Sequence, residues 1–458
     1  MSKFSTAESL HRLVKEAIDS GAASTIGEAQ QMFRTFRLGI EINEGEAQSA
    51  THQAALLTAV ALSRRVFLGG VIVSCPRPTP LAVPLPLART LGEAVTQLGG
   101  TLGEPSIDDP LLTIGGPPKL QYRRFNVRTV YSGWCGGVVP ANSDFTFPSR
   151  DTVPLAPMLA AALAVNEAFS FVRTGSSAAG RQPVGLSLWN PSPRSDWMVD
   201  SEREPILAYL PASLWVVGLG HLGQAFLWGL GLLPYPSSAQ LELVLQDIDI
   251  ITPSSESTSV LSEASLIGRR KTRAMSAWAE QRGFTTKIVE RCFDPHFIRR
   301  SDEPSVAFCG VDNALARQAL DQVGFDFIVE AGLGRGYQDF RAMRLHTLPG
   351  PLAASSIWRN GDRSEGTESR PGYQKLLADG DLDQCGVTLL AGKAVGAPFV
   401  GSIAACLALS EILRLLHGGR IHQLIDLDLK GMEHRNVVLH PADFSAINPG
   451  FVATGSAP

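Results

Sequence analysis

Cysteine is scarce in this sequence, and no two cysteines are close enough to form a recognisable pair. Six cysteines are spread over 458 residues, and none belongs to a Cys-x-x-Cys motif. Cysteines at that spacing are common ligands of structural zinc, and a disulfide framework is typical of short secreted chains. The sequence therefore predicts neither zinc nor disulfides, and we expect a reducing, cytoplasmic setting.

A surplus of basic residues is also absent. Lysine and arginine together number 40, against 44 aspartates and glutamates, which gives a net charge of −4. Because no excess of positive charge is available to neutralise phosphates along a strand, we exclude nucleic acid as a general partner.

A membrane anchor is not expected either. The N-terminus carries acidic residues and lacks the long apolar run of a secretory signal. Residues 214–235 contain no acidic or basic side chain and are long enough to cross a bilayer. Five glycines, a proline and a histidine within this segment favour a buried strand, turn and helix, so we predict no membrane partner.

The organisation of the chain indicates at least two domains. Hydrophobic residues make up 44% of the chain and charged residues 18%, which is enough apolar material for large cores. A polar, proline-bearing stretch at 190–205 is the expected boundary. Residues 154–175 and 398–419 align without a gap, and both read as an apolar helix closed by a glycine. Two buried helices of similar composition would look alike, but the matched ends favour duplication and a pseudo-dimer.

The second half contains a glycine-rich fingerprint in the right context. A short apolar strand runs into Gly218, Gly220 and Gly223 in the pattern Gly-x-Gly-x-x-Gly, and an apolar helix follows. The next predicted strand ends at Asp247 and Asp249, at about the distance where a carboxylate meets a ribose hydroxyl. These features describe a phosphate cradle, and they suit a nicotinamide-dependent oxidoreductase equally well.

Residues further along the chain favour a different reaction. Lys271 opens a helix, and another apolar strand ends at Asp312 and Asn313, followed by Arg317. This ordered set resembles the ThiF and ubiquitin-activating family. The resemblance implies an α/β fold with two Rossmann-like, ThiF-type adenylation domains as an internal pseudo-dimer.

The same resemblance implies roles for these residues. The three glycines would cradle the phosphates of ATP, Asp247 with Asp249 would hold the ribose, and Lys271 would neutralise the β- and γ-phosphates. Asp312 would bind Mg²⁺, while Asn313 and Arg317 would orient the site. Without the resemblance, Lys271 and Arg317 are ordinary solvated helix residues and Asp312 is an ordinary helix cap.

One element of the family pattern is missing. Relatives place an arginine after the second strand, whereas residues 252–261 are rich in serine and threonine and contain no arginine. Hydroxyl groups could take part of its role, or another arginine could reach the phosphates. The candidates are Arg269, Arg270 or an arginine from the N-terminal half, such as Arg34 or Arg37.

The first half is expected to be inactive. Its strand at 66–74 is followed by five prolines within residues 75–86. Proline has no amide hydrogen, so a turn of this composition cannot cradle a phosphate with its backbone. An unrelated α/β domain is the alternative interpretation of this half.

Cys385 is the best candidate for a thioester-forming nucleophile. It lies 13 residues before the helix at 398, beyond a polar stretch rich in glycine, serine and proline, where relatives place such a cysteine. An accessible thiol is a good nucleophile near neutral pH. Cys135 is the reserve candidate, Cys309 and Cys406 are expected in the core, and Cys75 and Cys292 lack a comparable loop.

These observations predict a domain layout and a set of partners. We expect an inactive domain at 1–200, an ATP-binding domain at 206–345, a crossover loop at 346–397, and a C-terminal helix and strand at 398–458. The length and the lack of Cys-x-x-Cys pairs distinguish the chain from sulfur-carrier enzymes of the ThiF and MoeB type. It looks more like the bacterial activating enzymes of ubiquitin-like conjugation operons, such as the Bil antiphage systems.

That resemblance implies a ubiquitin-like protein, a conjugating enzyme and a JAB-type protease as partners, and either a homodimer or a pseudo-dimeric monomer. The predicted activity is adenylation of the modifier's C-terminus, followed by a thioester on Cys385 and transfer to the conjugating enzyme. A catalytically silent scaffold is the alternative from another class.

Overall fold

The chain folds into two compact units of unequal size. The computed structural model describes residues 4–116, 123–148, 150–199, 204–359, 370–378 and 382–454. The first unit comprises residues 32–207 and 229–234, and the second comprises residues 1–31, 208–228 and 235–458. Along the chain the first unit gives way to the second between residues 207 and 208, and residues 1–31 group with the second unit.

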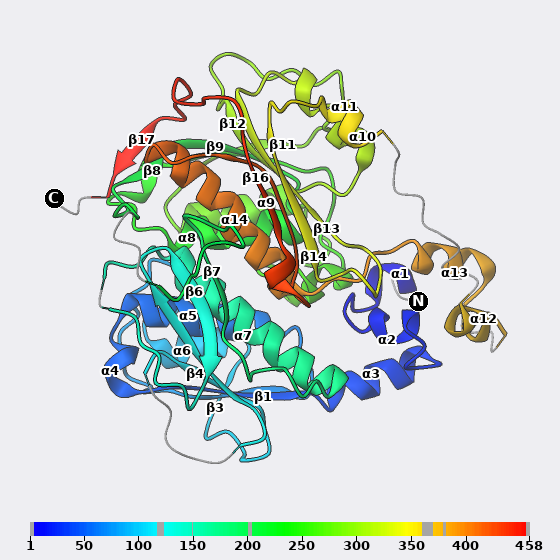
Figure 1. Cartoon of the computed structure of the whole chain (residues 1–458). Coiled ribbons are helices and arrows are strands. Elements are labelled where there is room, and N and C mark those ends of the chain that lie inside the picture. Colours follow the sequence, from blue (N-terminus) through cyan, green and yellow to red (C-terminus); the bar gives the residue numbers. More distant parts are fainter. Residues whose placement is uncertain are drawn as a thin grey trace. The chain divides into compact units, whose positions relative to one another are not determined.

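The first unit is built around a seven-stranded sheet (Figure 1). Its strands, in chain order, are β1 (Arg37–Ile42), β2 (Gly70–Ser74), β3 (Thr101–Leu102), β4 (Leu111–Ile114), β5 (Asn126–Ser132), β6 (Cys135–Pro140) and β7 (Val184–Ser187). Its helices are α4 (Glu44–Ala47), α5 (Ala50–Ser63), α6 (Leu91–Gln97) and α7 (Leu155–Thr174), and α3 (Ile26–Arg34) runs across the division. The strand order is β3-β2-β1-β4-β5-β6-β7, parallel from β3 to β5 and antiparallel from there on.

The second unit contains an eight-stranded sheet. Its strands are β9 (Ser213–Val217), β10 (Glu242–Gln246), β11 (Thr285–Val289), β12 (Val306–Cys309), β13 (Phe327–Leu333), β14 (Ala342–Leu348), β15 (His422–Asp428) and β16 (Asn436–Leu439). A small separate ladder pairs β8 (Tyr209–Pro211) with β17 (Phe451–Ala453). The order is β11-β10-β9-β12-β13-β14-β15-β16, again parallel as far as β13 and then antiparallel.

Nine helices of the second unit are described. They are α1 (Thr6–Ser9), α2 (Lys15–Asp19), α8 (His221–Leu232), α9 (Lys271–Gln281), α10 (Ala314–Gln318), α11 (Ala354–Ile357), α12 (Pro371–Ala378), α13 (Gln384–Ala391) and α14 (Pro398–Leu416). The last four residues of α8 group with the first unit. Part of the predicted crossover, at 360–369 and 379–381, lies outside the described residues.

The two sheets have the same strand order, which confirms the predicted α/β class with two similar domains. Strand β1 lies between β2 and β4, just as β9 lies between β10 and β12. The counterpart of β9 is therefore β1, and the counterpart of β10 is β2. Our sequence-based alignment of the proline-rich segment with the glycine loop was wrong, because that segment follows β2.

The duplicated helices also occupy corresponding positions. Helix α7 packs on β5 and β6, and α14 packs on their counterparts β13 and β14. Helix α7 ends at Gly175, which has a left-handed φ of +61°. In α14 the left-handed residue is Gly418, with φ +68°, one position earlier than the aligned Gly419. Only glycine adopts this conformation without cost, so both helices end by the same device.

Both of these helices are long and apolar enough to cross a membrane by composition alone. Within the unit that contains it, each is mostly buried, with 78% of the most apolar window of α7 and 89% of that of α14 inside the protein. Core helices of soluble domains pass the same test. The charge-free segment at 214–235 forms strand β9, the glycine-rich turn and helix α8, as the sequence predicts.

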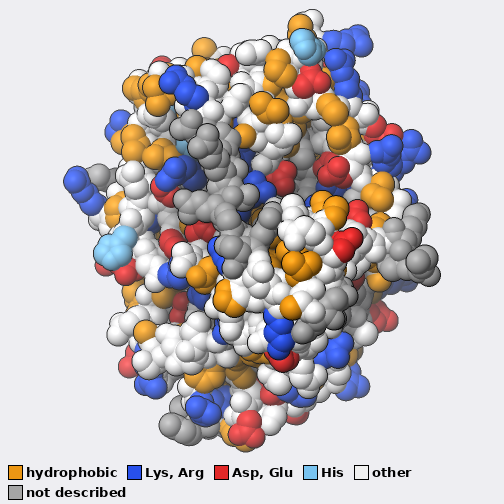
Figure 2. Space-filling model, turned by 90° about the vertical axis from the view of Figure 1, so that its right-hand side faces the viewer, with side chains coloured by type: hydrophobic (Ala, Val, Ile, Leu, Met, Phe, Trp, Pro, Cys, Tyr) orange, Lys and Arg blue, Asp and Glu red, His pale blue; other side chains and the backbone are white. Residues whose placement is uncertain are grey.

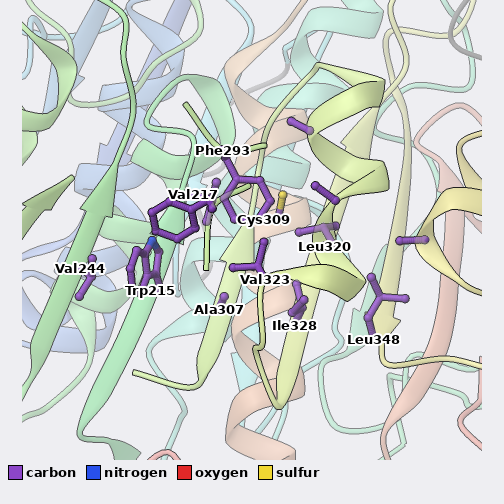
Figure 3. Close-up of a cluster of buried hydrophobic side chains, with 14 residues drawn as sticks. Trp215, Val217, Val244, Phe293, Ala307, Cys309, Leu320, Val323, Ile328 and Leu348 are labelled. Atoms are coloured by element: carbon purple, nitrogen blue, oxygen red, sulfur yellow. The ribbon is translucent and has the colours of Figure 1, made fainter. Parts of the chain in front are cut away.

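A cluster of apolar side chains packs on one face of the second sheet (Figure 3). Trp215, Val217 and Ala307 project from the central strands into it, and Cys309 lies among them with no exposed surface. Buried parallel strands need apolar residues on both faces, which is why β9 and β12 read as continuous apolar runs. Burial raises the pKa of the Cys309 thiol to about 12, so this cysteine is a core residue, as expected.

The N-terminal segment is anchored to the second unit by a buried charged network. Lys15 and Asp19 form an ion pair of 2.6 Å, with each side chain 2% exposed. The Tyr373 hydroxyl of α12 donates to Asp19 at 2.5 Å. A buried charge is tolerated only when it is paired and hydrogen-bonded. This network explains why residues 1–31 do not fold with the first half.

Candidate functional site

The carboxyl ends of β9, β10 and β12 border a cavity of about 720 Å³, which we call the glycine-loop cavity. Ligands of open α/β sheets bind at this edge because the loops that follow parallel strands meet there. All nine of the residues assigned a role at the nucleotide site lie in the second unit and follow these strands or the loops beyond them. The structure brings most of them to this cavity: Gly218, Gly220, Asp247, Asp249, Lys271, Asp312, Asn313 and Arg317.

The glycine loop depends on glycine for two different reasons. Gly218 has φ +85°, a conformation that other residues rarely adopt. A Cβ atom on Gly223 would overlap the carbonyl oxygen of Gly218. At Gly220 a Cβ would meet nothing within 4 Å, so packing within the protein does not require glycine there. Because Gly220 has no side chain, a phosphate can approach its backbone closely.

Asp247 fixes the glycine loop and the start of the next loop. Its carboxylate accepts the Leu219 amide at 2.7 Å and the Asp249 amide at 2.8 Å. Lys271 lies between the two acids, 2.8 Å from the Asp249 carboxylate and 3.8 Å from that of Asp247. The Asp247 carboxylate has further lone pairs for a ligand hydroxyl. Lys271 is 13% exposed, so the acids hold its ammonium group at the cavity wall.

Arg12, which the sequence did not single out, lines the glycine-loop cavity. Its main-chain amide donates to Ser257 at 3.1 Å, and its guanidinium donates to Ser254 at 3.2 Å. Burial lowers the pKa of the Arg12 guanidinium, and the nearby Asp312 carboxylate opposes this shift. The serine-rich stretch therefore holds an arginine in place of supplying one.

None of the four arginines proposed from the sequence takes this position. Arg37 forms an ion pair with Asp109 in the first unit, and Arg34 lies in the same unit. Arg270 bonds the Ile248 carbonyl, and neither it nor Arg269 lines the cavity. The four arginines named from the sequence do not line the glycine-loop cavity, whereas Arg12, also from the N-terminal half, does.

The segment after β12 contributes three polar side chains. Asp312 is exposed at the cavity. Asn313 caps α10, with its side chain accepting the Leu315 amide at 2.9 Å. Arg317 points back from α10, and its Nε donates to the Val311 carbonyl at 3.0 Å. The cap and the back-bonded arginine together fix the turn that presents Asp312.

His221, the first residue of α8, also lines the cavity. Its Nε2 atom is buried and accepts or donates no hydrogen bond among the described residues. Its ring packs so closely on Gly401 that a Cβ there would overlap it. Burial lowers the pKa of His221 to about 4, so the imidazole is neutral at physiological pH.

A metal ion would have to share its ligands with a substrate. Among the described residues, no three His, Cys, Asp or Glu side chains gather as a ready-made metal site. Mg²⁺ is commonly held by one or two carboxylates together with substrate phosphates, and it does not need a full protein cage. Asp312 fits that requirement because its carboxylate is exposed at the cavity.

A second cavity of about 830 Å³ adjoins the first, and we call it the adjacent cavity. Seven residues line both cavities: Arg317, Leu333, Gly334, Arg335, Gly392, Lys393 and Ala394. The adjacent cavity is bordered by β13, β14 and the end of α13. Figure 2 shows acidic and basic side chains interspersed over one face of the molecule, without a field of one sign.

Cys385 is accessible but lies outside both cavities as described. It is exposed in the first turn of α13, which Asp383 caps by accepting the Gly386 amide at 2.7 Å. Gly392, just beyond the other end of this helix, lines both cavities. Seven residues of helix span about 10 Å. About 10 Å of helix therefore separates Cys385 from the residues of this helix end that line the cavities.

The remaining cysteines differ in accessibility. Cys135, the reserve candidate, is 4% exposed, with its thiol 3.8 Å from the partly buried Glu204 carboxylate. Cys406 is fully buried in α14, as predicted. Cys292 is exposed and lines the glycine-loop cavity, which the sequence gave no reason to expect.

The corresponding edge of the first unit has different chemistry. The chain leaves β1 at Asn43 and enters α4, which contains Glu44 and Glu46. The Glu46 carboxylate lies so close to Gly116, after β4, that a Cβ there would overlap it. His52 of α5 packs in the same way on Gly115. A carboxylate and an imidazole thus occupy the place that the glycine loop keeps open in the second unit.

Comparison with known families gives two matches that together span most of the chain. The sequence model of the BilD N-terminal domain matches residues 37–188, and that of the BilD C-terminal domain matches residues 210–419. The chain is similar to the bacterial E1-like protein BilD of Collimonas sp. (strain OK412). The two are 46% identical over 422 residues, which cover 91% of this chain and 90% of the relative.

Solved structures give more distant matches. The chain is similar to E. coli MccB bound to succinimide, with 12% identity and a TM-score of 0.33 over 50% of this chain and 62% of MccB. It thus spans less than two thirds of MccB. It is also similar to E. coli tRNA N6-threonylcarbamoyladenosine dehydratase, TcdA, with 16% identity and a TM-score of 0.30, over 45% of this chain and 86% of TcdA.

Proposed function

The chain belongs to the BilD family of bacterial E1-like proteins, and on that premise we propose that it activates the C-terminus of a ubiquitin-like protein with ATP. The observation that carries the proposal is the glycine-loop cavity, where a glycine-rich backbone turn, basic side chains that include Lys271 and Arg12, and the exposed carboxylate of Asp312 meet. No other part of the described chain combines these groups.

Each group has a separate role in adenylation. The carboxylate oxygen of the modifier forms a bond to the α-phosphorus of ATP while the bond to pyrophosphate breaks. Lys271 and Arg12 stabilise the negative charge that develops on the phosphates, because both are held rigidly by neighbouring side chains. The backbone N–H of Gly220 donates to the phosphates, since those of Gly218 and Leu219 already bond Gln246 and Asp247, and Asp247 accepts a ribose hydroxyl.

Mg²⁺ supplies charge neutralisation at the phosphates when it is bound. Asp312 is the residue that would hold it, since its carboxylate is exposed at the cavity and near the Arg12 guanidinium. Asn313 caps α10 and Arg317 bonds the turn, and these contacts keep the carboxylate facing the cavity.

The adjacent cavity gives the modifier's C-terminus a route to ATP. Its walls include a glycine-rich stretch from Gly332 to Gly336, which leaves room for an extended chain. Because seven residues line both cavities, a polypeptide tail in one ends beside a nucleotide in the other. This arrangement favours a polypeptide carboxylate as the group that attacks ATP.

Thioester formation on Cys385 is the second step of the proposal. The thiolate would attack the acyl carbonyl, with AMP as the leaving group, after α13 shifts toward the cavities. Transfer to a conjugating enzyme would follow, with a JAB-type protease as a further partner, in a cytoplasmic antiphage system. The pseudo-dimeric pairing of the two units belongs to the same proposal.

The first unit is proposed to bind no nucleotide. Its loop after β1 has glutamates in place of glycines, and the Glu46 carboxylate lies against Gly116. A fixed negative charge at the carboxyl edge of a sheet repels phosphate. A single active nucleotide site per chain is the result.

The experiment that tests this function is ligand-dependent stability. Unfolding of the wild type is measured with ATP·Mg²⁺ and, separately, with NAD(H), alongside Lys271→Ala and Asp312→Ala. Ligand at 100 times its dissociation constant adds about 2.7 kcal/mol of stability. We expect ATP·Mg²⁺ to stabilise the wild type and to lose most of that effect in both variants.

Lys287→Ala is the matched control. This lysine is exposed on β11 and pairs with Glu242 outside the cavity, so its loss leaves ATP stabilisation unchanged. Stabilisation by NAD(H) alone would indicate an oxidoreductase, and stabilisation by neither ligand would indicate a scaffold. Either result would contradict the proposal that this chain activates a ubiquitin-like protein with ATP.

A further inference from the structure

A buried acidic residue lies in the floor of the adjacent cavity, outside every role assigned so far. Glu330 projects from β13 with its side chain 1% exposed. Its Oε2 is 3.2 Å from His346 Nδ1, and its Oε1 is 2.9 Å from Arg317 Nε. A carboxylate buried to this degree is kept charged only by close cationic partners.

Arg317 is held on three sides by this arrangement. Its Nε hydrogen is donated to the Val311 carbonyl, so the contact with Glu330 is an ion pair without a hydrogen bond. Its guanidinium lies over Gly332, where a Cβ would be only 3.2 Å from Nη2. Neither terminal nitrogen makes a hydrogen bond among the described residues.

The three residues differ in which cavities they line. Arg317 lines both cavities, whereas Glu330 and His346 line only the adjacent one. His346 is in turn fixed by Trp358, with the ring centroids 5.3 Å apart in an edge-to-face arrangement. The orientation of Arg317 is therefore controlled from the polypeptide side of the site.

We propose that Glu330 and His346 are positioning residues that aim the Arg317 guanidinium at the acyl end of the modifier. The inference rests on the proposed function. A guanidinium with two free N–H edges is suited to a carboxylate before the reaction and to the acyl carbonyl after it. Loss of the Glu330 charge then weakens binding of the acyl group and leaves nucleotide binding intact.

The test compares two probes of the nucleotide site, one without an acyl end and one with it, and asks how each variant changes the ratio of their affinities relative to the wild type. AMP occupies the nucleotide site alone, and 5′-O-(glycylglycyl-sulfamoyl)adenosine adds a non-hydrolysable acyl group. The dissociation constant of each is measured by calorimetry for wild type, Glu330→Gln, His346→Gln and Arg317→Lys. The change in the ratio of the two dissociation constants between wild type and variant reports on the contact with the acyl end.

We expect Glu330→Gln to keep AMP affinity within about twofold and to lose about tenfold in affinity for the acyl analogue, the scale of one charge-assisted hydrogen bond. Arg317→Lys keeps the charge but loses the planar fork and the Nε contact with the Val311 carbonyl, so it loses at least as much affinity for the acyl analogue, and its AMP affinity falls as well because the turn that presents Asp312 is no longer held. The double variant Glu330→Gln with Arg317→Lys loses no more affinity for the acyl analogue than Arg317→Lys alone, because Glu330 acts through Arg317. Glu242→Gln, at an exposed ion pair, is the matched control with no change.

The results distinguish a failure of this inference from a failure of the proposed function. If the wild type binds neither AMP nor ATP, the proposed function fails. If it binds both, and Glu330→Gln loses equal affinity for AMP and the analogue or loses none, the inference is overturned and the function stands. Should Glu330→Gln not fold, His346→Gln gives the same comparison, since it leaves the carboxylate in place.

Discussion

The two units share a strand order, but only the second ends its first strand in a glycine loop. In the first unit the chain passes from β1 into a short helix with two glutamates, and Glu46 contacts the backbone after β4. In the second unit Gly218 and Gly220 leave the same edge open. Strand pairing and core packing are thus retained in both units, while the chemistry at the carboxyl edge differs.

A second pair of residues shows which features are structural. Glu167 of α7 and its aligned partner Glu411 of α14 are both buried. Glu167 accepts the Gly180 amide at 2.9 Å, and Glu411 accepts the His422 amide at 3.1 Å. Each carboxylate ties its helix to the residues that lead into the next strand. Because both units keep this contact, it supports the fold and not the reaction.

The cysteines of the two units give the sharpest test of this difference. Cys385→Ala is expected to abolish the thioester, because Cys385 is exposed on the helix that ends at both cavities, and Cys292, the exposed cysteine that lines the glycine-loop cavity, is expected to form none. Cys135→Ala in the first unit should leave it intact, because that thiol is 4% exposed. The readout is a reductant-sensitive adduct with the ubiquitin-like partner on a non-reducing gel. An adduct that survives in Cys385→Ala contradicts the assignment.

Arginines give the next largest contrast. Arg12→Ala removes a partly buried cation from the glycine-loop cavity and should weaken ATP·Mg²⁺ binding by about 30-fold to 100-fold, or 2–3 kcal/mol. Arg34→Ala and Arg37→Ala, in the first unit, should stay within about twofold. Calorimetric titration with ATP·Mg²⁺ measures all three. If Arg12→Ala bound ATP·Mg²⁺ with wild-type affinity, or if Arg37→Ala bound it more weakly, the arginine that contacts the phosphates would have to come from the first unit.

The sequence predicts those parts of the site that follow directly from strand ends. Gly218, Asp247 and Asp312 each come just after an apolar run, and parallel strands bring such positions to one edge. Arg12 could not be found in this way, because its contact with Ser257 joins residues 245 positions apart. Its position depends on how the N-terminal segment docks, which no local pattern encodes.

The strand alignment failed for a related reason. Strand β1 has the sequence RLGIEI, in which charged residues and a glycine interrupt the apolar pattern. The run at 66–74 is more apolar, so it resembled the first strand of a nucleotide-binding unit more closely. Only residues 70–74 of that run are strand, and sheet order makes it the counterpart of β10.

Histidines predict a smaller, pH-dependent effect. Above pH 6.5 His221 is neutral in both the folded and unfolded states. Below that value the unfolded chain takes up a proton that the folded chain refuses until about pH 4, because burial lowers the folded pKa. The free energy of unfolding therefore falls with decreasing pH, by about 3 kcal/mol over this window.

His221→Asn should lack this contribution, as seen in the difference between wild-type and variant urea unfolding from pH 7 to pH 4. His52→Gln in the first unit should act in the same direction, since burial also lowers the pKa of His52. His434→Gln is the control, as this side chain is 84% exposed. Parallel pH profiles for wild type and His221→Asn would refute the burial argument.

Glu46→Gln should have the smallest effect, and it tests whether charge alone silences the first unit. A phosphate cradle needs backbone N–H groups that a ligand can approach, and removing one negative charge builds none of these. We expect calorimetry to give one ATP per chain in both wild type and Glu46→Gln, with Glu44→Gln as an exposed control and stability changes within about 0.5 kcal/mol. Two ATP per chain in Glu46→Gln would mean that the loop after β1 is already shaped for phosphate and that the carboxylate blocks it. One negative charge would then account for the difference in ATP binding between the two units, and the lack of a glycine loop in the first unit would not prevent binding.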